Sequence, residues 1–473
     1  MMAAHISPYS GSWYPRQETK LNALLDEVFE DSRRRNGPHL LPGVLGIVAP
    51  HAAPGYSGTV AAGAYRHLQA ARPARVFILG FSHRAGRRGI AIPDVTSYRT
   101  PLGDVAIDES TARALCSTAP FHLEDERDLC DHSVEIQLPF LQRSAGAAAV
   151  IPLYVGQLAE AERTEAAEVL ARTWHPGDVL VASSDLTHYG SGFHYEPFPV
   201  DRQIAARLRE LDGSAIDAAS SLDSALFFER LNESGATACG CQPIALLLRT
   251  LSLIGGEAIF QQEIDYQTSG EITGDFTQSV SYAALGYFPR SSFELNEAER
   301  NELLSSARAT LRHLGDTGKR AAMPARSLPA LAMRAPVFVS IHHAGRLLGC
   351  IGRVFHPLPL SDGVPEMTLA AALDDPRRSP DAGLPRDAEI EISVLTPMKL
   401  VRGAGAIRIG RDGAYVKCGA HAGLLLPQVA GSDWTAARFV DLLLRKAGLG
   451  PRAYGAPDMR LYVFQAQVFG GRS

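Results

Sequence analysis

Four short strings in this chain contain residue types that bind metal ions and move protons. PHAAPGYSG carries His51, GFSH carries His83, SSDLTHYG carries Asp185 and His188, and CGCQP begins at Cys239. Two imidazoles and a thiolate form a plausible ligand set for a transition metal. The strings lie far apart in the sequence, so the fold has to bring them together.

The first three strings each follow an apolar run that is typical of a buried parallel strand. These runs are Val44–Val48, Arg75–Leu79 and Asp178–Ala182. In an open α/β sheet, ligands bind in the crevice outside the carboxyl ends of the strands. We therefore expect the histidines and the aspartate of these strings to meet at one edge of a sheet.

Asp185 and His188 are three residues apart, which would place them on one face if the segment became helical. Such a pair can act as a general base and a general acid, because histidine titrates near neutral pH. The alternative is that Asp185 caps the helix that follows. Both roles are compatible with the sequence.

His132 and Glu135 have the same spacing in DHSVEIQLPFL. Glu135 can accept a hydrogen bond from a ligand histidine, or even act as a carboxylate ligand. Alternatively, Asp131 or Ser133 caps a helix, and Glu135 is a first-turn carboxylate favoured by the helix dipole. We favour hydrogen bonding or capping over metal ligation.

The cysteines do not resemble a disulfide framework, because there are six in a chain of 473 residues. Cys241 is the rival of Cys239 as a thiolate ligand, since only a glycine separates them. A redox pair formed by these two cysteines is a less favoured alternative.

Composition restricts the class of protein. The net charge of -5 argues against a nucleic-acid or acidic-membrane binder, which usually carries a basic excess. No apolar run reaches the roughly 18 residues of a membrane span. The N-terminal segment lacks the basic and apolar regions of a signal peptide, so we expect a cytoplasmic protein.

Strand-like and helix-like runs alternate from residue 1 to about 290, which predicts an α/β sandwich with a mostly parallel central sheet. Residues 289–296 are expected to form a short linker with turn formers. Residues 297–473 begin with a helical pattern and continue with shorter strand-like runs and a late helix. This order predicts a second, α+β domain.

The strings of the first block, together with GSWYP at 11–15 and DHSVEIQLPFL, resemble the Memo family in type and order. The second block resembles the AMMECR family through GCIG at 349–352, EISVLTP at 391–397 and GLLLPQVA at 423–430. The whole chain is similar to proteins B and A of the AmmeMemoRadiSam system joined together. That name implies a radical-SAM protein as partner, and this chain lacks the CxxxCxxC spacing of such an enzyme.

The resemblance implies a fold similar to class III extradiol dioxygenases, which hold iron(II) with two histidines and a carboxylate. In the Memo branch the metal residues are two histidines and a cysteine, which correspond to His51, His83 and Cys239. Asp185 and His188 are then expected to line the pocket. The chain departs from the family pattern at three places: Ala53-Pro54 precedes Gly-Tyr, Phe81 replaces a proline, and the arginine of LRGCIG is missing.

Three hypotheses follow from these observations. The first is an iron(II)- or copper-dependent redox or dioxygenase-like enzyme acting on a small, unknown substrate. The second is a non-catalytic module that stores or buffers a metal, and the third is an adaptor with an AMMECR-type interaction domain. A metal that keeps an open coordination position would favour the enzyme over the storage module.

Overall fold

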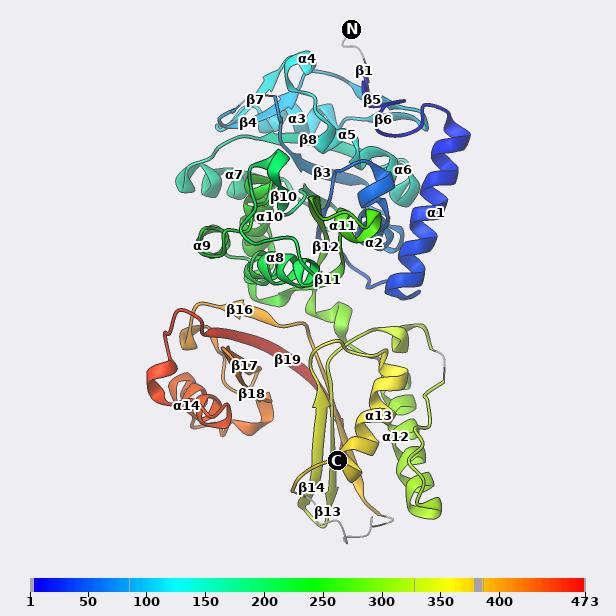
Figure 1. Cartoon of the computed structure of the whole chain (residues 1–473), viewed down its shortest axis with the longest axis vertical. Coiled ribbons are helices and arrows are strands. Elements are labelled where there is room, and N and C mark those ends of the chain that lie inside the picture. The colour runs from blue at the N-terminus through cyan, green and yellow to red at the C-terminus, as the bar shows by residue number, and fades with distance from the viewer. Residues whose placement is uncertain (1–3, 85, 327, 378–384, 386, 472–473) are drawn as a thin grey trace. The chain divides into compact units, whose positions relative to one another are not determined.

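The computed structural model describes residues 4–84, 86–326, 328–377, 385 and 387–471. The chain divides into two compact units, Met1–Ser292 and Phe293–Ser473, called unit 1 and unit 2 below (Figure 1). In the described part of the chain, no helix has the length and apolar character needed to cross a membrane.

Unit 1 is built on a nine-stranded sheet with the order β10-β12-β2-β9-β3-β8-β4-β7, in which β11 also pairs with β12. Its strands are β2 (Gly46–Ala49), β3 (Arg75–Gly80), β4 (Ile90–Pro93), β7 (Phe121–Glu124), β8 (Ala149–Val155), β9 (Val179–Ser183), β10 (His188–Gly190), β11 (Ile259–Thr268) and β12 (Gln278–Pro289). The four neighbours β2, β9, β3 and β8 run parallel to one another. They are buried on both faces, which explains their continuous apolar sequences.

Antiparallel strands extend the parallel centre on both sides. β12 pairs with β2 in register Leu285 to Val48, and β4 pairs with β8. A separate three-stranded sheet contains β1 (His5–Ile6), β5 (Ser97–Thr100) and β6 (Gly103–Ala106). The prediction of an α/β sandwich is confirmed, and the strands at the centre of its sheet are parallel as expected. The sheet as a whole is mixed, because the pairings of β12 with β2, β10 and β11 and of β4 with β8 are antiparallel.

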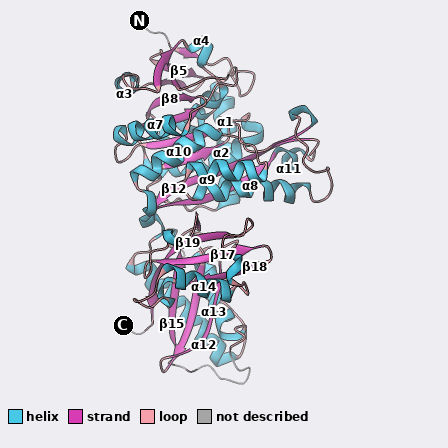
Figure 2. Ribbon diagram, turned by 90° about the vertical axis from the view of Figure 1, so that its left-hand side faces the viewer, coloured by secondary structure: helices cyan, strands magenta, loops and turns pink. Residues whose placement is uncertain are grey.

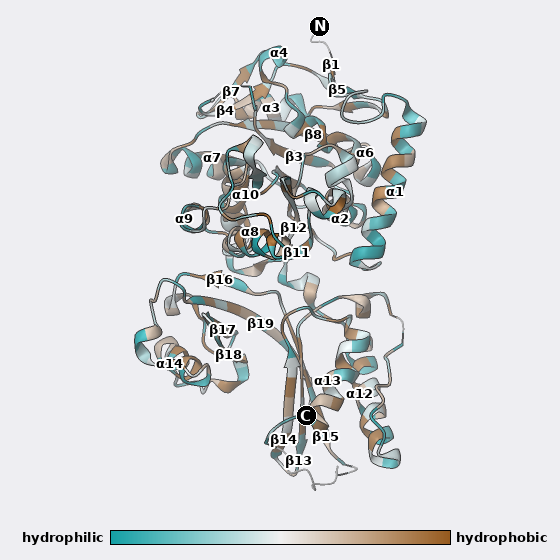
Figure 3. Cartoon of the chain, viewed as in Figure 1, coloured by the Kyte–Doolittle hydropathy of each residue, from teal (hydrophilic) through white to brown (hydrophobic). Residues whose placement is uncertain are grey.

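Helices form a layer on each side of the main sheet (Figure 1). One layer contains α1 (Glu18–Asn36), α2 (Pro54–Ala71) and α6 (Gln137–Ala145), and the other contains α7 (Glu160–Thr173), α8 (Ile204–Ser220), α9 (Ser224–Ser234) and α10 (Cys241–Ile254). The shorter helices are α3 (Glu109–Leu115), α4 (Glu126–Leu129), α5 (His132–Glu135) and α11 (Ser269–Thr273). Helix α1 buries Leu21, Leu25 and Val28 at helical spacing. Figure 3 shows hydrophilic and hydrophobic stretches alternating along this helix.

Unit 2 contains one antiparallel sheet of order β14-β13-β15-β19-β17-β18, with β16 also paired to β19. Figure 2 labels β15, β17, β18 and β19 among its strands. The strands are β13 (Val337–His343), β14 (Arg346–Arg353), β15 (Glu389–Leu395), β16 (Lys399–Val401), β17 (Asp412–Cys418), β18 (His421–Leu425) and β19 (Arg460–Gly470). The long strand β19 pairs with β17 along its first half and with β15 along its second half. It therefore joins the two parts of the sheet.

Each part of the unit 2 sheet has its own helical cover. Helix α13 (Leu360–Leu373) packs on β13, on β14 and on α12 (Glu297–Thr317). Helix α14 (Ala436–Lys446) buries Phe439 and Leu443 against Val416 and Val463. Helices on an antiparallel sheet confirm the predicted α+β class of this second block.

Candidate metal centre

Three neighbouring parallel strands of unit 1 end at the same edge of the sheet. Their spatial order is β2, β9, β3. His51 follows β2, Asp185 follows β9 and His83 follows β3. The short strand-to-loop transitions therefore place these three residues together, as the sequence predicts for the carboxyl edge of a parallel sheet.

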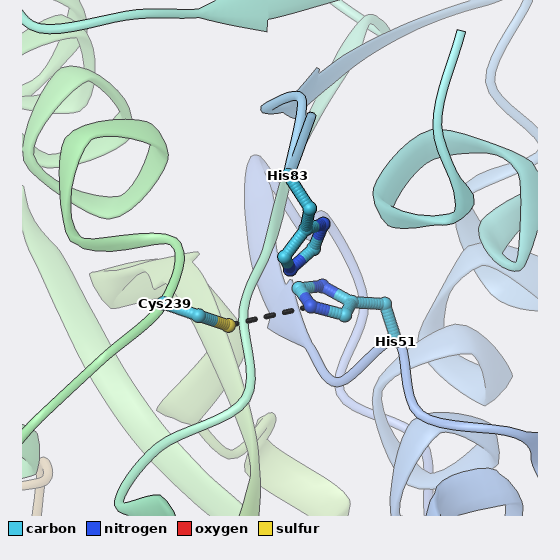
Figure 4. A group of neighbouring side chains, drawn as sticks. All are labelled: His51, His83 and Cys239. Carbon is cyan, nitrogen blue, oxygen red and sulfur yellow. Dashed lines mark hydrogen bonds between the residues drawn. The ribbon is translucent and has the colours of Figure 1, made fainter. Parts of the chain in front are cut away.

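His51 forms the floor of the site, since only 2% of its surface is exposed. Its Nδ1 lies 2.9 Å from the Ser183 hydroxyl, and its Nε2 lies 3.3 Å from the Cys239 sulfur (Figure 4). Burial, assisted by the neighbouring His83, lowers the pKa of His51 to about 3. The imidazole is therefore neutral, which is the form that binds a metal ion.

Asp131 fixes His83 at the mouth of the site. One carboxylate oxygen accepts a hydrogen bond from His83 Nδ1 at 2.8 Å, and the other accepts from the His83 backbone N–H at 3.1 Å. Burial would raise the pKa of Asp131, but the hydrogen bond from His83 and the neighbouring His132 lower it to about 2. Because the carboxylate only accepts, Nδ1 carries a proton, and Nε2 is the His83 nitrogen that is available to coordinate a metal ion.

Cys239 approaches the histidines from the loop that precedes α10. The Gly240 N–H donates to the Ser184 hydroxyl at 2.9 Å, and the Asp185 N–H donates to the Cys239 sulfur at 3.2 Å. A Cβ on Gly240 would lie 2.3 Å from the Ser183 carbonyl oxygen, so only glycine allows this close approach. Burial and the Asp185 carboxylate raise the pKa of the Cys239 thiol well above its usual value.

The candidate ligand atoms of His51, His83 and Cys239 all lie within 4.8 Å of one another. The two imidazole rings are nearly perpendicular, at 83°, with centroids 5.4 Å apart. This donor set fits a single transition-metal ion, because two imidazoles and one sulfur converge from three loops. Cys241 instead begins α10, and the cluster contains Cys239.

A second group, His83, Asp131 and His132, is equally compact. The rings of His83 and His132 are stacked, however, with centroids 4.1 Å apart and an interplanar angle of 17°. A metal ion binds in the plane of an imidazole, so stacked rings present parallel rather than convergent lone pairs. His132 therefore packs against a candidate ligand, and its geometry does not suit shared coordination with His83.

Asp185 and His188 lie beside the cluster without forming a helix, because the chain enters β10 at His188. Asp185 therefore caps no following helix, and its carboxylate accepts the backbone N–H of His51 at 2.9 Å. Burial raises the pKa of Asp185 to about 6, which is a suitable range for proton transfer. His188 Nδ1 donates to the Leu186 carbonyl at 2.9 Å, so Nε2 is the ring nitrogen that is not used by this bond.

Glu135 does not contact either candidate ligand histidine. Its Oε1 lies 3.1 Å from His5 Nε2, and the side chain is fully buried. The acceptor of His83 is Asp131, which also caps α5 through the Ser133 N–H. Asp131 therefore caps the helix, as one of the two alternatives predicted. The acceptor of the hydrogen bond from a candidate ligand histidine is Asp131 and not Glu135.

Sequence reasoning also missed Ser183 and Gln137. Gln137 is buried and donates to the Ser183 hydroxyl at 2.9 Å and to the Pro50 carbonyl at 3.0 Å. These bonds hold the partner of His51 Nδ1 in place. The position of Ser183 could have indicated its role, because it is the last residue of β9 and lies two residues before Asp185.

The cluster opens onto a pocket of about 350 Å³. The loop after β3, the end of β8 and the start of α10 provide its walls. The lining residues are Phe81, Ser82, His83, Gly86, Arg87, Tyr154, Val155, Gly156, Gln157, Cys239, Cys241, Gln242 and Pro243. The volume lies in the range of small-molecule sites.

These features define an α/β sandwich protein with a candidate His₂Cys metal site at the carboxyl edge of its parallel strands. The Memo-like protein family model matches residues 7–286, and the AMMECR1 family model matches residues 304–469. The chain belongs to the Memo-like family and carries an AMMECR1 domain in the same polypeptide. The predicted combination of the two families is confirmed.

Three relatives each match more than half of the chain. The chain is 30% identical over 287 residues to the memo-1 homolog of Caenorhabditis elegans, covering 58% of this chain and 80% of that protein. It is also 30% identical to the human protein MEMO1 over 285 residues, covering 58% of this chain and 94% of that protein. A MEMO1 family protein of Thermoplasma acidophilum matches at 30% identity over 278 residues, covering 58% and 96%.

Among solved structures, an uncharacterized protein of Pyrococcus horikoshii matches with 32% identity and a TM-score of 0.33. The match covers 36% of this chain and 90% of that chain.

Proposed function

We propose that this chain binds a redox-active transition metal through His51, His83 and Cys239 and acts on a small molecule in the adjoining pocket. The observation that carries the proposal is the convergence of three donor groups within 4.8 Å, next to a pocket of about 350 Å³. Iron(II) is our first candidate and copper the second. Either ion would supply one-electron redox and oxygen chemistry when bound.

The chain's own residues would prepare the site. Ser183 and Asp131 orient the two imidazoles through Nδ1, which directs Nε2 toward the ion. Asp185 can hold or release a proton beside Cys239, and His188 Nε2 can accept one. The thiolate donates more electron density than a carboxylate, so ring cleavage of the extradiol type does not follow from the fold.

A catalytic role is favoured over metal storage because the cluster supplies three protein donors and opens onto the pocket. Catalytic sites keep an open coordination position, whereas closed sites use four protein ligands. We also propose a radical-SAM protein as partner, on the ground that the chain joins two families named together in the AmmeMemoRadiSam system.

The test is the metal content of protein purified anaerobically from iron-replete cells. We expect about one iron or copper ion per chain, in line with a single mononuclear site, and its loss in His51→Ala, His83→Ala and Cys239→Ser. Cys116→Ser and His122→Ala change the same residue types elsewhere in unit 1 and should keep the metal. Wild-type protein that takes up no transition metal after reconstitution would refute the proposal.

A further inference from the structure

We propose that Cys350 is a modification site that forms a mixed disulfide with a small thiol compound bearing a carboxylate. Cys350 is a free, partly exposed cysteine on β14 of unit 2. The site uses none of the candidate metal ligands, so this inference goes beyond the proposed function and does not rest on it.

Cys350 belongs to a row of polar residues on the face of the sheet opposite α13. It pairs with Ser340 on β13, which pairs in turn with Glu391 on β15. A Cβ on Gly349 would lie 2.1 Å from the Ala371 carbonyl oxygen, so residue 349 faces α13. Successive strand residues point to opposite faces, and directly paired residues point to the same face. The three polar side chains of the row therefore share the face away from α13.

The middle residue of this row carries a hydroxyl that is not used in the fold. Ser340 is only 7% exposed, and within the described part of the chain its side chain forms no hydrogen bond. A buried polar group without a partner costs free energy, and a ligand that pairs with it recovers that cost. Neighbouring strands lie about 4.8 Å apart, so a small group attached to the Cys350 sulfur can reach this hydroxyl.

Lys446 on α14 supplies a positive charge beside Cys350. Burial lowers the pKa of Lys446, and two neighbouring groups also act on it: the Cys350 thiol raises it and Arg377 lowers it. No carboxylate of a described residue pairs with this lysine. Arg377, in contrast, is neutralised by Asp375, which accepts from its Nε at 2.9 Å. A negative group attached to Cys350 can therefore form an ion pair with Lys446.

Glu391, at the other end of the row, does not cancel this attraction. Its Oε1 accepts a hydrogen bond from Gln428 Nε2 at 3.4 Å. The intervening strand β13 places its backbone roughly 10 Å from that of Cys350, which is about the distance over which 0.1 M salt screens a charge. The Ser340 hydroxyl and the Lys446 ammonium, rather than the Glu391 carboxylate, are the groups nearest to the thiol.

The backbone of Cys350 is held in place at the edge of the sheet. Its N–H donates to Asp375 Oδ2 at 2.7 Å, and its carbonyl accepts from Arg377 Nη2 at 3.2 Å. These two bonds use the outward-facing backbone groups of the edge strand β14. The sulfur therefore keeps a defined position in the row.

The proposed reaction is a thiol–disulfide exchange. The Cys350 thiolate attacks one sulfur of a small disulfide, so that a new S–S bond forms and the old S–S bond breaks. The leaving thiolate takes up the proton that Cys350 has lost. The small disulfide is the oxidant, and an excess of small thiol reverses the step.

Cys418 is the matched control, because its neighbour has the opposite charge. Its thiol donates to both carboxylate oxygens of Asp458 at 3.4 Å, and burial together with Asp458 raises the pKa of this thiol. A carboxylate repels an anionic reagent and attracts a cationic one. The two cysteines of unit 2 should therefore prefer reagents of opposite charge.

The experiment compares three disulfides of similar size: anionic dithiodipropionate, neutral dithiodiethanol and cationic cystamine. Peptide mass spectrometry measures the rate of modification of Cys350 and Cys418 in the full chain. Each rate is divided by that of the same reagent with N-acetylcysteine amide, which removes differences in intrinsic reactivity. We expect Cys350 to prefer the anion over the neutral reagent about fivefold, the effect of a unit charge about 4 Å away in water. Cys418 should prefer cystamine, and about 1 M salt should abolish both preferences.

Lys446→Gln should remove the preference of Cys350 for the anion, and Ser340→Ala should lower the rate with the anion severalfold. Arg445→Gln changes the preceding residue on α14, whose charge is already paired with Asp441, and should leave the preference unchanged. Thermal unfolding confirms that each variant is folded.

Three outcomes would overturn the inference. The first is that Cys350 stays unmodified under conditions that modify Cys418. The second is that the normalised rates of Cys350 with the three reagents are equal. The third is that its preference for the anion survives in Lys446→Gln or is lost equally in Arg445→Gln.

Discussion

A single carboxylate fixes both the backbone and the ring of His83. Because Asp131 uses one oxygen for each, the ring cannot rotate about its side-chain bonds without breaking a hydrogen bond. The same aspartate starts α5, so the orientation of a candidate ligand depends on the cap of a helix. The orientation of the His83 ring is thereby fixed before a metal ion binds, which reduces the conformational entropy lost on binding.

Asp131→Asn should weaken metal binding by about 10- to 100-fold, the usual cost of losing the hydrogen-bond partner of a ligand histidine. The amide can offer its NH₂ to Nδ1 and so favour the wrong tautomer. Competition titration against a chelator measures the change. Asp128→Asn alters an exposed aspartate nearby and should leave the affinity unchanged; an equal loss in both variants would contradict this role.

His132→Phe should keep the bound metal, because a phenyl ring preserves the stacking on His83 and removes both ring nitrogens. His83→Phe removes a candidate ligand and should lose the metal. Metal analysis of the two variants compares the two overlapping groups directly. Metal loss in His132→Phe, with normal folding, would assign His132 as a ligand.

At the scale of the element, Gly240 allows the loop before α10 to reach the end of β9. Gly240→Ala should push Cys239 away from His51, since the added Cβ meets the Ser183 carbonyl. We expect a cost of about 1–3 kcal/mol in unfolding free energy, together with a weaker thiolate-to-cobalt absorption after Co(II) loading. Gly213→Ala in α8 meets no neighbouring atom and should leave the absorption intact.

Strand β1 is held to unit 1 partly by the pair formed between His5 and the buried Glu135. Burial alone would lower the pKa of His5, but hydrogen bonds with Cys130 and Glu135 raise it to about 10. The folded-state pKa therefore exceeds the unfolded value of about 6.5. The stabilisation is complete below about pH 6.5 and is lost as the pH rises through about 10.

His5→Gln should cost on the order of 3 kcal/mol at pH 7, because it leaves the buried Glu135 carboxylate without a cation. The difference from wild type should shrink as the pH approaches 10, where wild-type His5 is losing its proton. Urea unfolding across this range measures it, with His122→Gln as an exposed control. A difference that stays constant with pH would contradict the assignment.

The sequence predicts the strands that carry the site residues better than it predicts the hydrogen-bond partners of those residues. β2, β3 and β9 are continuous apolar runs, so their carboxyl ends, and hence His51, His83 and Asp185, could be placed from local pattern. The role of Asp131 could not be predicted in this way, because its hydrogen bond with His83 joins residues 48 positions apart and depends on how α5 packs in the fold. Asp185 and His188 would share one face only if this segment were helical, but long-range pairing of His188 with Val280 starts a strand at His188 instead.

At the scale of the whole molecule, unit 1 contains every candidate ligand, and unit 2 has its own core around α14. Metal should therefore stabilise unit 1 selectively. We expect calorimetry to resolve two transitions, with chelation lowering only one. The shift corresponds to about 2.7 kcal/mol when free metal is 100 times its dissociation constant. Equal shifts of both transitions, or no shift, would contradict selective binding.

The chain order of unit 1 has a consequence during protein synthesis. The main sheet of unit 1 is complete only when β12 pairs with β2. Because β12 ends at Pro289, this happens after all three candidate ligands have been synthesised. Roughly 180 residues follow Ser292, and ribosomes add about 5–20 residues per second. A nascent chain therefore has roughly 10 to 40 seconds in which unit 1 can complete its sheet and bind a metal ion before the synthesis of unit 2 ends.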